Sequence, residues 1–366
     1  MSFSIYRKTR SVRLTVTTPD GEKVVVENLN GDEGFYLSFE CTRAMTAEPA
    51  IATVTAHNLP AEVLGIFEAA QTKKADDYDG LLIALGLKTE QVNPSGSDAL
   101  EAGFLIVEVE AGFDGAMSRV FYCIGARVDS SSDGDDVTIV STIRATENLD
   151  GALLGLPLRA FETGSTLFEL VDYLRQIAGL GAGNLSYASL TAILGESRLD
   201  SPYIVSGGQA LAHLTNVLQY LPMRWFIDDR EIWICGRDGM PSPTNALPWI
   251  ADGPAIQLEP IIGRPTKSDG GFVEVACMLC PRVLPGRIVA LTPGGLALAS
   301  QGLSPAASQV RRAMVPPGAY RCEEVSHRGD TRGGEYRTLM KLRPVTGPEA
   351  NALFASALSQ DGSLVY

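Results

Sequence analysis

Glu323–Leu342, EEVSHRGDTRGGEYRTLMKL, is the most informative stretch of the chain. Strand-like residues stand at both of its ends, in 320–327 and 335–343, and a polar segment containing the glycine pair Gly333 and Gly334 joins them. Two strand patterns separated by such a segment are typical of a β-hairpin. We therefore expect a hairpin here, with its loop over the polar segment.

Two motifs that suggest a function overlap this hairpin. His327 precedes Asp330 by three residues, as a catalytic His/Asp pair could, and Arg328, Gly329 and Asp330 form the adhesion tripeptide Arg-Gly-Asp. A tripeptide recurs by chance, and glycine between charged residues is what a tight loop favours. We interpret His327 and Asp330 as loop residues that bond one another or the nearby backbone.

The size and composition of the chain set limits on what it is. With 366 residues, 45% hydrophobic and 20% charged, it is expected to fold into two or three globular domains. Its formal charge of −13 argues against specific binding of nucleic acid, which needs a basic surface. If the chain lines a channel, an acidic wall would repel a passing polyanion.

The sequence favours a protein made and folded in the cytosol. No apolar run is long enough to span a bilayer, so we expect no membrane anchor. The N-terminal residues 1–11 place basic side chains after apolar ones, with no hydrophobic region behind them, which is not the pattern of a secretory signal.

The cysteines raise the question of a metal site. Cys277, Cys280, Cys322 and His327 together would give three sulfurs and one imidazole, an acceptable zinc inventory. However, 271–280 reads as a strand, in which Cys277 and Cys280 would point to opposite faces. We expect buried thiols rather than disulfides or zinc. The six cysteines are Cys41, Cys123, Cys235, Cys277, Cys280 and Cys322.

The first 149 residues read as one strand-rich block. Turn signals at 19–21 and 30–32 separate short β-rich runs, and Asn58 before Pro60 indicates a helix over 60–70. Residues 73–100 read as a surface excursion. The expected strands are 11–17, 23–27, 35–41, 50–58, 104–110, 118–128 and 136–146.

A helical segment and a second strand block follow. Apolar residues recur every three or four positions in 166–180 and 209–221, which predicts two amphipathic helices. A hairpin over 224–227 and 231–235 carries Trp225 and Trp233, expected core anchors. Strands are then expected at 258–262, 271–280, 286–291, 320–327 and 335–343, with a long connection over 296–314 and a short helix over 349–358.

The sequence offers no recognisable catalytic motif. His57, His213 and His327 fall in three different blocks, and acidic pairs are too numerous to nominate one. A Gly-x-Ser-x-Gly elbow, a Walker loop and a His-Glu-x-x-His zinc motif are all missing from the sequence. We expect no catalytic, cofactor-binding or metal site, with a cell-wall hydrolase as the enzymatic alternative.

Several phrases, in order, resemble the baseplate hub proteins of long-tailed bacteriophages. They are His57-Asn58-Leu59 after a strand, the strand–Ala-Gly-aromatic turn–strand segment 107–128, the helix and aromatic hairpin of 207–234, the run 259–291, and the hairpin 326–338. The resemblance covers most of 1–343. Residues 73–100 and the tail beyond 344 do not match it.

The resemblance implies an α+β, mainly β fold and a structural role. Two β-barrel-like tube domains, 1–149 (with a helical and loop excursion at about 60–100) and 244–343, would flank a small α/β connector domain, 150–243, before a tail, 344–366. Such hubs are homotrimers whose six barrels join a sixfold tail tube to a threefold central spike and form part of the DNA conduit.

The resemblance also implies partners and a location. The partners would be the tail tube protein ring, the central spike protein, and the tape measure and baseplate wedge proteins. The protein would be assembled in the host cytoplasm and reside at the virion tail tip, with a role in genome ejection. The hub of a phage-related secretion or injection system is the alternative.

Overall fold

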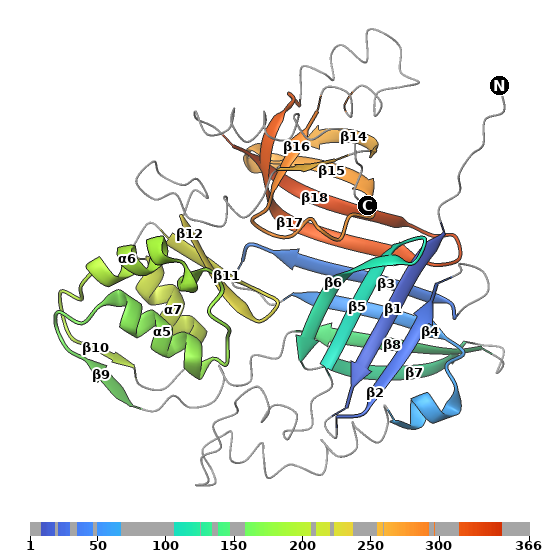
Figure 1. Cartoon of the computed structure of the whole chain (residues 1–366), viewed down its shortest axis with the longest axis horizontal. Coiled ribbons are helices and arrows are strands. Elements are labelled where there is room, and N and C mark those ends of the chain that lie inside the picture. The colour runs from blue at the N-terminus through green and yellow to red at the C-terminus, as the bar shows by residue number, and fades with distance from the viewer. Residues whose placement is uncertain are drawn as a thin grey trace.

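The computed structural model shows an α+β fold that is mainly β, as predicted (Figure 1). The residues that it describes are 9–18, 21–29, 35–46, 50–66, 106–124, 126–133, 138–146, 158–205, 210–219, 223–236, 255–258, 260–292, 296 and 315–345. The expected excursion at 73–100, the helix at 349–358 and nearly all of the connection at 296–314 lie outside these residues.

A four-stranded antiparallel sheet is built from the first strand block. Its order is β2-β1-β5-β6, with β1 and β5 paired from Arg10↔Phe113 to Thr17↔Ile106. Alternating burial along β2 shows that one face of the sheet is covered and the other faces outward. The strands are β1 (Arg10–Thr17), β2 (Lys23–Asn28), β5 (Ile106–Phe113) and β6 (Ala116–Ile124).

A ten-stranded sheet joins strands from both predicted strand blocks. Its main path is β14-β15-β18-β17-β3-β4-β8-β7, and β16 pairs with β17 and β13 beside that path. The strands are β3 (Leu37–Ala44), β4 (Ile51–His57), β7 (Ala126–Asp133), β8 (Thr138–Thr146), β13 (Ile256–Gln257), β14 (Ile261–Lys267), β15 (Val273–Met278), β16 (Ile288–Leu291), β17 (Gly318–Asp330) and β18 (Tyr336–Pro344).

The two blocks meet where β17 pairs with β3. This antiparallel ladder runs from Glu324↔Ala44 to Asp330↔Ser38 and places the C-terminal hairpin beside the N-terminal strands. The domain boundaries expected from the sequence stay a prediction, but hydrogen bonding between strands continues from one expected barrel into the other.

The four-stranded sheet covers one half of the ten-stranded sheet. In Figure 1 β1, β2, β5 and β6 lie across β3, β4, β8 and β7, and side chains of both layers form one core. Val12, Leu14 and Val109 from the smaller sheet meet Phe39 and Val54 from the larger one. A separate core under β15, β17 and β18 contains Val275, Val325, Met340 and Leu342.

The connector is a compact α/β unit to one side of the strands (Figure 1). Helices α5 (Leu167–Ile177) and α7 (Ala210–Gln219) confirm the predicted amphipathic segments. Thr166 and Glu169 form a capping box that fixes the start of α5. The predicted hairpin is β11 (Met223–Asp228) and β12 (Glu231–Gly236).

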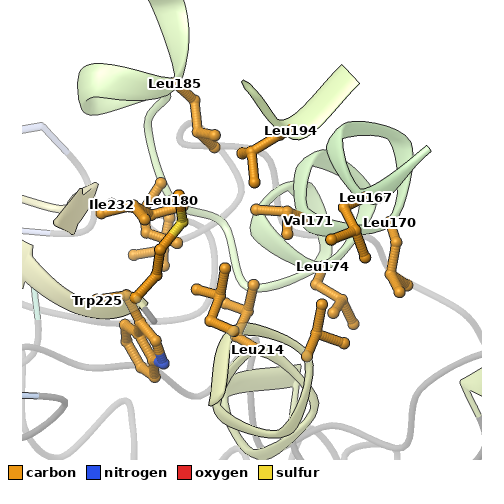
Figure 2. Packing of buried hydrophobic residues seen from close by; sticks show 14 of the residues in the cluster. Leu167, Leu170, Val171, Leu174, Leu180, Leu185, Leu194, Leu214, Trp225 and Ile232 are labelled. Carbon is orange, nitrogen blue, oxygen red and sulfur yellow. The ribbon is translucent and has the colours of Figure 1, made fainter. Parts of the chain in front are cut away.

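Leucines from α5 and α7 meet the β11–β12 hairpin in the connector core (Figure 2). Leu170, Val171 and Leu174 of α5 and Leu214 of α7 are fully buried. Trp225 is 4% exposed, and its indole N–H donates to Thr215 Oγ1 at 3.2 Å, which ties the hairpin to α7. Trp225 is therefore the core anchor that the sequence predicted.

Several features of the fold differ from the sequence expectations. The single strand expected at 118–128 is divided between β6 and β7, which belong to different sheets. Helix α6 (Ala188–Glu196) and the short pair β9 (Arg159–Phe161) and β10 (Tyr203–Val205) were not expected. α6 has no side-chain cap and begins after Tyr187, so the usual start signals are missing. No helix in the described part of the chain is long and apolar enough to cross a membrane.

Candidate functional site

His327 lies inside the protein, which corrects its predicted place in the hairpin loop. It belongs to β17, has no exposed surface, and pairs across the sheet with Thr338 on one side and Cys41 on the other. Asp330 follows His327 by three residues in the same strand, and side chains alternate between the two faces of a sheet, so the two side chains lie on opposite faces. The expected bond between His327 and Asp330 is therefore ruled out by strand geometry.

The imidazole of His327 takes part in a structural hydrogen-bond chain. Thr338 Oγ1 accepts the Cys280 N–H at 2.8 Å and lies 3.0 Å from Nδ1 of His327. Burial, together with the positive charge of Arg43, lowers the pKa of His327 to about 3, against an opposing contact with the Val283 backbone. The ring is therefore neutral at physiological pH and connects the 280–283 turn to the sheet.

Three of the cysteines that were expected to be buried thiols, Cys41, Cys277 and Cys322, are buried, and Cys280 is half-buried. Cys41, Cys277, Cys280 and Cys322 are free cysteines, and Cys280 lies just past the end of β15. Burial raises the pKa of the Cys277 and Cys322 thiols. Across the described ranges, no three His, Cys, Asp or Glu side chains come together in a way that could hold a metal ion.

The Arg-Gly-Asp tripeptide lies in a paired strand, not in a loop. All three residues belong to β17 and pair with Glu40, Phe39 and Ser38 of β3. A Cβ added to Gly329 would stand 2.1 Å from the Phe39 ring, so glycine is required for that ring to cover the strand. The tripeptide is explained by packing and pairing within the sheet.

The tip of the β17–β18 hairpin is bonded to the start of the chain. Asp330 Oδ1 accepts from the backbone N–H groups of Arg332 and Gly333, which fixes the turn. Its Oδ2 accepts from the Tyr36 hydroxyl at 3.1 Å, and its carbonyl accepts from Arg10 Nη1 at 2.7 Å. Asp330 thus links the C-terminal hairpin to β1 and to the segment before β3.

Tyr336 connects the two sheets through its hydroxyl group. The oxygen lies 2.7 Å from the carbonyl oxygens of Ser11 and Gly112, and it accepts the Gly112 N–H at 3.1 Å. The ring packs edge-on against Phe113. Burial raises the pKa of this phenol, so it keeps its proton. One side chain of β18 therefore joins β1 and β5 of the covering sheet.

The other two histidines lie in separate places. His57 stacks on Tyr36 with ring centroids 4.3 Å apart, at the end of β4. His213 of α7 lies 2.9 Å from the Tyr203 hydroxyl through Nδ1. The structure does not bring His57, His213 and His327 together, consistent with their separation in the sequence.

A buried arginine, which sequence reasoning missed, attaches the connector to β3. Arg43 is 2% exposed, and its Nε donates to Asp228 Oδ1 at 2.6 Å, while Nη2 lies 2.9 Å from Asp229. Burial raises the pKa of Asp228, although Arg43 opposes the rise. The sequence did hold a signal for this buried residue. Alternate positions of β3 face the core, and Arg43 takes the fourth of them after Leu37, Phe39 and Cys41.

The β11–β12 tip is shaped to meet this arginine. Asp229 and Arg230 both have positive φ, 50° and 62°, between the paired residues Asp228 and Glu231, as a two-residue type I′ turn requires. Arg119 of β6 adds a 3.0 Å bond to Asp229. The connector hairpin is therefore bonded to a strand of each sheet, β3 of the ten-stranded one and β6 of the four-stranded one.

The ten-stranded sheet has a polar face opposite its cores. On β3, β17 and β18, half-buried or exposed side chains alternate with buried ones. Acidic and basic groups are mixed here, so the acidic wall suggested by the net charge is not present on these strands. The face carries Ser38, Glu40, Thr42, Glu324, Ser326, Arg328, Asp330, Arg337, Lys341 and Arg343.

Comparisons with known proteins give structural likenesses at low identity. No protein-family model matches the chain, and no curated protein matches its sequence. The fold is similar to the 43 kDa tail protein of prophage MuSo2 from Shewanella oneidensis, with 9% identity, a TM-score of 0.47, and 91% of this chain and 97% of that one covered.

Two further solved structures are similar in the same way. One is the tail protein from Neisseria meningitidis MC58, with 10% identity, a TM-score of 0.42, and 90% of this chain and 96% of that one covered. The other is the E. coli c3393 protein, a component of the type VI secretion system that is itself structurally similar to the T4 bacteriophage tail proteins gp27 and gp5. It has 12% identity and a TM-score of 0.45, and the match covers 85% of this chain and 74% of that one. These likenesses concern the fold alone.

Proposed function

We propose that this chain is the structural hub of a phage tail, a homotrimeric ring between the sixfold tail tube and the threefold central spike. The observation that carries the proposal is the sheet that runs through both strand blocks, from β14 to β7. A single chain thereby supplies two strand modules side by side, and three chains would supply six.

The ends of this sheet give the ring a means of assembly. Within the described residues, β14 and β7 end the main path and each has one neighbour on it. Edge strands offer unpaired backbone groups to another chain. Pairing β7 of one copy with β14 of the next is a head-to-tail contact, and such contacts close into a ring when the rotation per copy allows it.

The edge at β14 is irregular, which favours a closed assembly over open aggregation. Gly263 has a φ of 69°, Pro265 lacks an N–H, and the β14–β15 register shifts between Ile262 and Thr266. Bulges and prolines at an edge limit nonspecific strand addition. A partner strand would pair on either side of this interruption.

In this proposal the polar face of the ten-stranded sheet lines the conduit. The opposite face is occupied by apolar cores, and Arg43 holds the connector on that same buried side of β3. The tube ring, the spike, the tape measure and the wedge proteins would contact the rims and outer surfaces. No catalytic step is part of this function, and assembly would take place in the host cytoplasm.

The first test is the mass of the purified full-length protein by light scattering after size exclusion. We expect three times the chain mass of 39.0 kDa and, by electron microscopy, rings that stack on the tube protein. A stable monomer that binds neither tube nor spike would exclude the proposal. Peptidoglycan incubated with the protein should stay intact, and its cleavage would favour the hydrolase alternative.

A further inference from the structure

We propose that the cationic side chains on the polar face of the β17–β18 hairpin are masked by partners within the chain, so that duplex DNA passes this face without being held. The inference rests on the proposed conduit and adds a property of its wall. It concerns Arg328, Arg337, Lys341 and Arg343.

Arg328 is held between two carboxylates. Its Nε and Nη2 lie 2.9 and 2.6 Å from Glu40 Oε1 on the neighbouring strand β3, and its Nη1 lies 3.4 Å from Glu335. The side chain is 38% exposed and Glu40 is 51% exposed, so the pair is open to solvent. The planar donor fork that would bind a phosphate is directed at Glu40 instead.

Glu335 serves a second arginine. Its carboxylate binds Arg337 Nε at 3.1 Å, with a further contact to Nη2. Glu40, Arg328 and Arg337 stand directly opposite one another on β3, β17 and β18, which places them in one row across the sheet. Two carboxylates therefore neutralise two neighbouring guanidinium groups.

The remaining two cations of the hairpin face are engaged as well. Lys341 Nζ lies 4.8 Å from the centre of the Phe272 ring, and Arg343 lies 4.4 Å from the same centre. Arg343 Nε also lies 3.2 Å from Glu323. The ring holds both side chains in place through its negative face, and Glu323 supplies the carboxylate that offsets the charge of Arg343.

Masking matters because DNA binding is cumulative. Each phosphate neutralised by a free Lys or Arg steepens the salt dependence of binding by about 0.9 in log–log slope and strengthens binding at low salt. In a ring of three copies, uncovered arginines at 328 and 337 would form a repeated cationic band. With the carboxylates in place, a phosphate would have to displace Glu40 or Glu335 first.

The masking is tested by the double variant Glu40→Gln/Glu335→Gln in the purified full-length protein. We expect it to gain binding to a short DNA duplex of about tenfold or more near 50 mM salt, and to lose that gain at high salt. Adding Arg328→Gln and Arg337→Gln to the double variant should abolish the gain. No gain in the double variant, or a gain that persists without the two arginines, would overturn the masking.

The matched control changes the net charge by the same amount at another place on the protein. Glu27→Gln/Glu110→Gln removes both carboxylates from Arg13, which they contact at 3.0 and 3.1 Å on the outward face of the four-stranded sheet. In particles assembled with each variant, we expect slower DNA ejection only with the Glu40/Glu335 pair. A DNA-binding gain with unchanged ejection would show that this face does not meet DNA, while electron microscopy of the same particles reports separately whether the chain is the hub.

Discussion

His327 shows how a residue that suggests catalysis can have a structural role. Its sequence distance of three from Asp330 invites a catalytic pairing, but in a strand that distance means opposite faces. The imidazole is instead fully buried beside Thr338, and its pKa is about 3. In the folded protein this ring stays neutral down to about pH 3, whereas in the unfolded chain it takes up a proton near pH 6.5, so it influences stability in acid.

We predict that His327 makes the protein less stable below pH 6.5. Because the folded pKa lies below the unfolded value of about 6.5, the unfolded state takes up the proton first. Stability contributed by the neutral ring is therefore present above pH 6.5, and it falls by about 1.4 kcal/mol per pH unit toward pH 3. Urea unfolding of wild type and His327→Leu between pH 7 and 5 measures this, and the variant should show the shallower slope.

Thr338→Val supplies the control for that measurement. It removes the hydroxyl that accepts the Cys280 N–H and should cost about 1–3 kcal/mol at every pH. The histidine is retained, so the slope between pH 7 and 5 should persist. If His327→Leu keeps the wild-type slope, the ring is not the titrating group.

At the scale of elements, the β17–β18 hairpin holds together the four-stranded and ten-stranded sheets, which together form the strand body. β17 pairs with β18 and β3, and its loop bonds to β1 through Arg10. Tyr336 on β18 adds the link to the covering sheet. The hairpin thus belongs to the ten-stranded sheet and is bonded to the four-stranded one, although it lies near the opposite end of the chain from β1 and β3.

We predict that Tyr336→Phe weakens the packing of the two sheets. The change removes one hydroxyl and leaves the carbonyls of Ser11 and Gly112 and the Gly112 N–H without it, while the ring still packs on Phe113. A buried backbone group that loses its hydrogen-bond partner lowers the free energy of unfolding by about 1–3 kcal/mol. Chemical denaturation followed by circular dichroism gives the difference in free energy of unfolding.

Tyr320→Phe is the comparison, because its hydroxyl donates a single bond, to the Pro316 carbonyl at 2.6 Å. It should cost less, about 1 kcal/mol. Equal losses in the two variants would show that Tyr336 is an ordinary core tyrosine rather than a link between sheets.

The sequence predicted elements better than it predicted their neighbours. Alternating residues located β1, β17 and β18, and three-and-four spacing located α5 and α7, because those periods follow from burial of one face. Alternation does not encode which strand lies beside another. The pairing of β17 with β3, nearly three hundred residues apart in sequence, could not be derived from it.

The side chains that hold the structure together were equally hard to find. Arg43, Tyr336 and Gly329 act through partners that are far away in sequence. His327 was placed in a loop because glycine and charge around it resembled turn chemistry. Only the pairing of Gly329 with Phe39 shows why that glycine belongs to a strand.

At the scale of the whole molecule, the connector is attached to the strand body through buried charge. Arg43 from β3 reaches Asp228 and Asp229 at the hairpin tip, and its Nη1 donates to the Val120 carbonyl of β6 at 3.2 Å. The proposed hub would need this unit in a fixed orientation for neighbouring rings to fit. A buried ion pair is suited to that, since its geometry is strict and loss of one partner is costly.

We predict that Arg43→Met releases the connector from the strand body. The carboxylate of Asp228 would stay buried without its cation, at a cost of about 3–5 kcal/mol. Trp225 and Trp233 lie in the connector hairpin, and Trp249→Phe removes the third tryptophan of the sequence. In that background tryptophan fluorescence should change at lower denaturant than the circular dichroism signal of the sheets, whereas the two signals should coincide when Arg43 is retained. Arg43→Met/Asp228→Leu should recover much of the loss, because the uncompensated charge is gone.

Arg119→Met, which removes a 46% exposed partner of Asp229, should cost less than about 1 kcal/mol. An Arg43→Met variant whose two transitions still coincide at the wild-type midpoint would mean that apolar packing alone positions the connector.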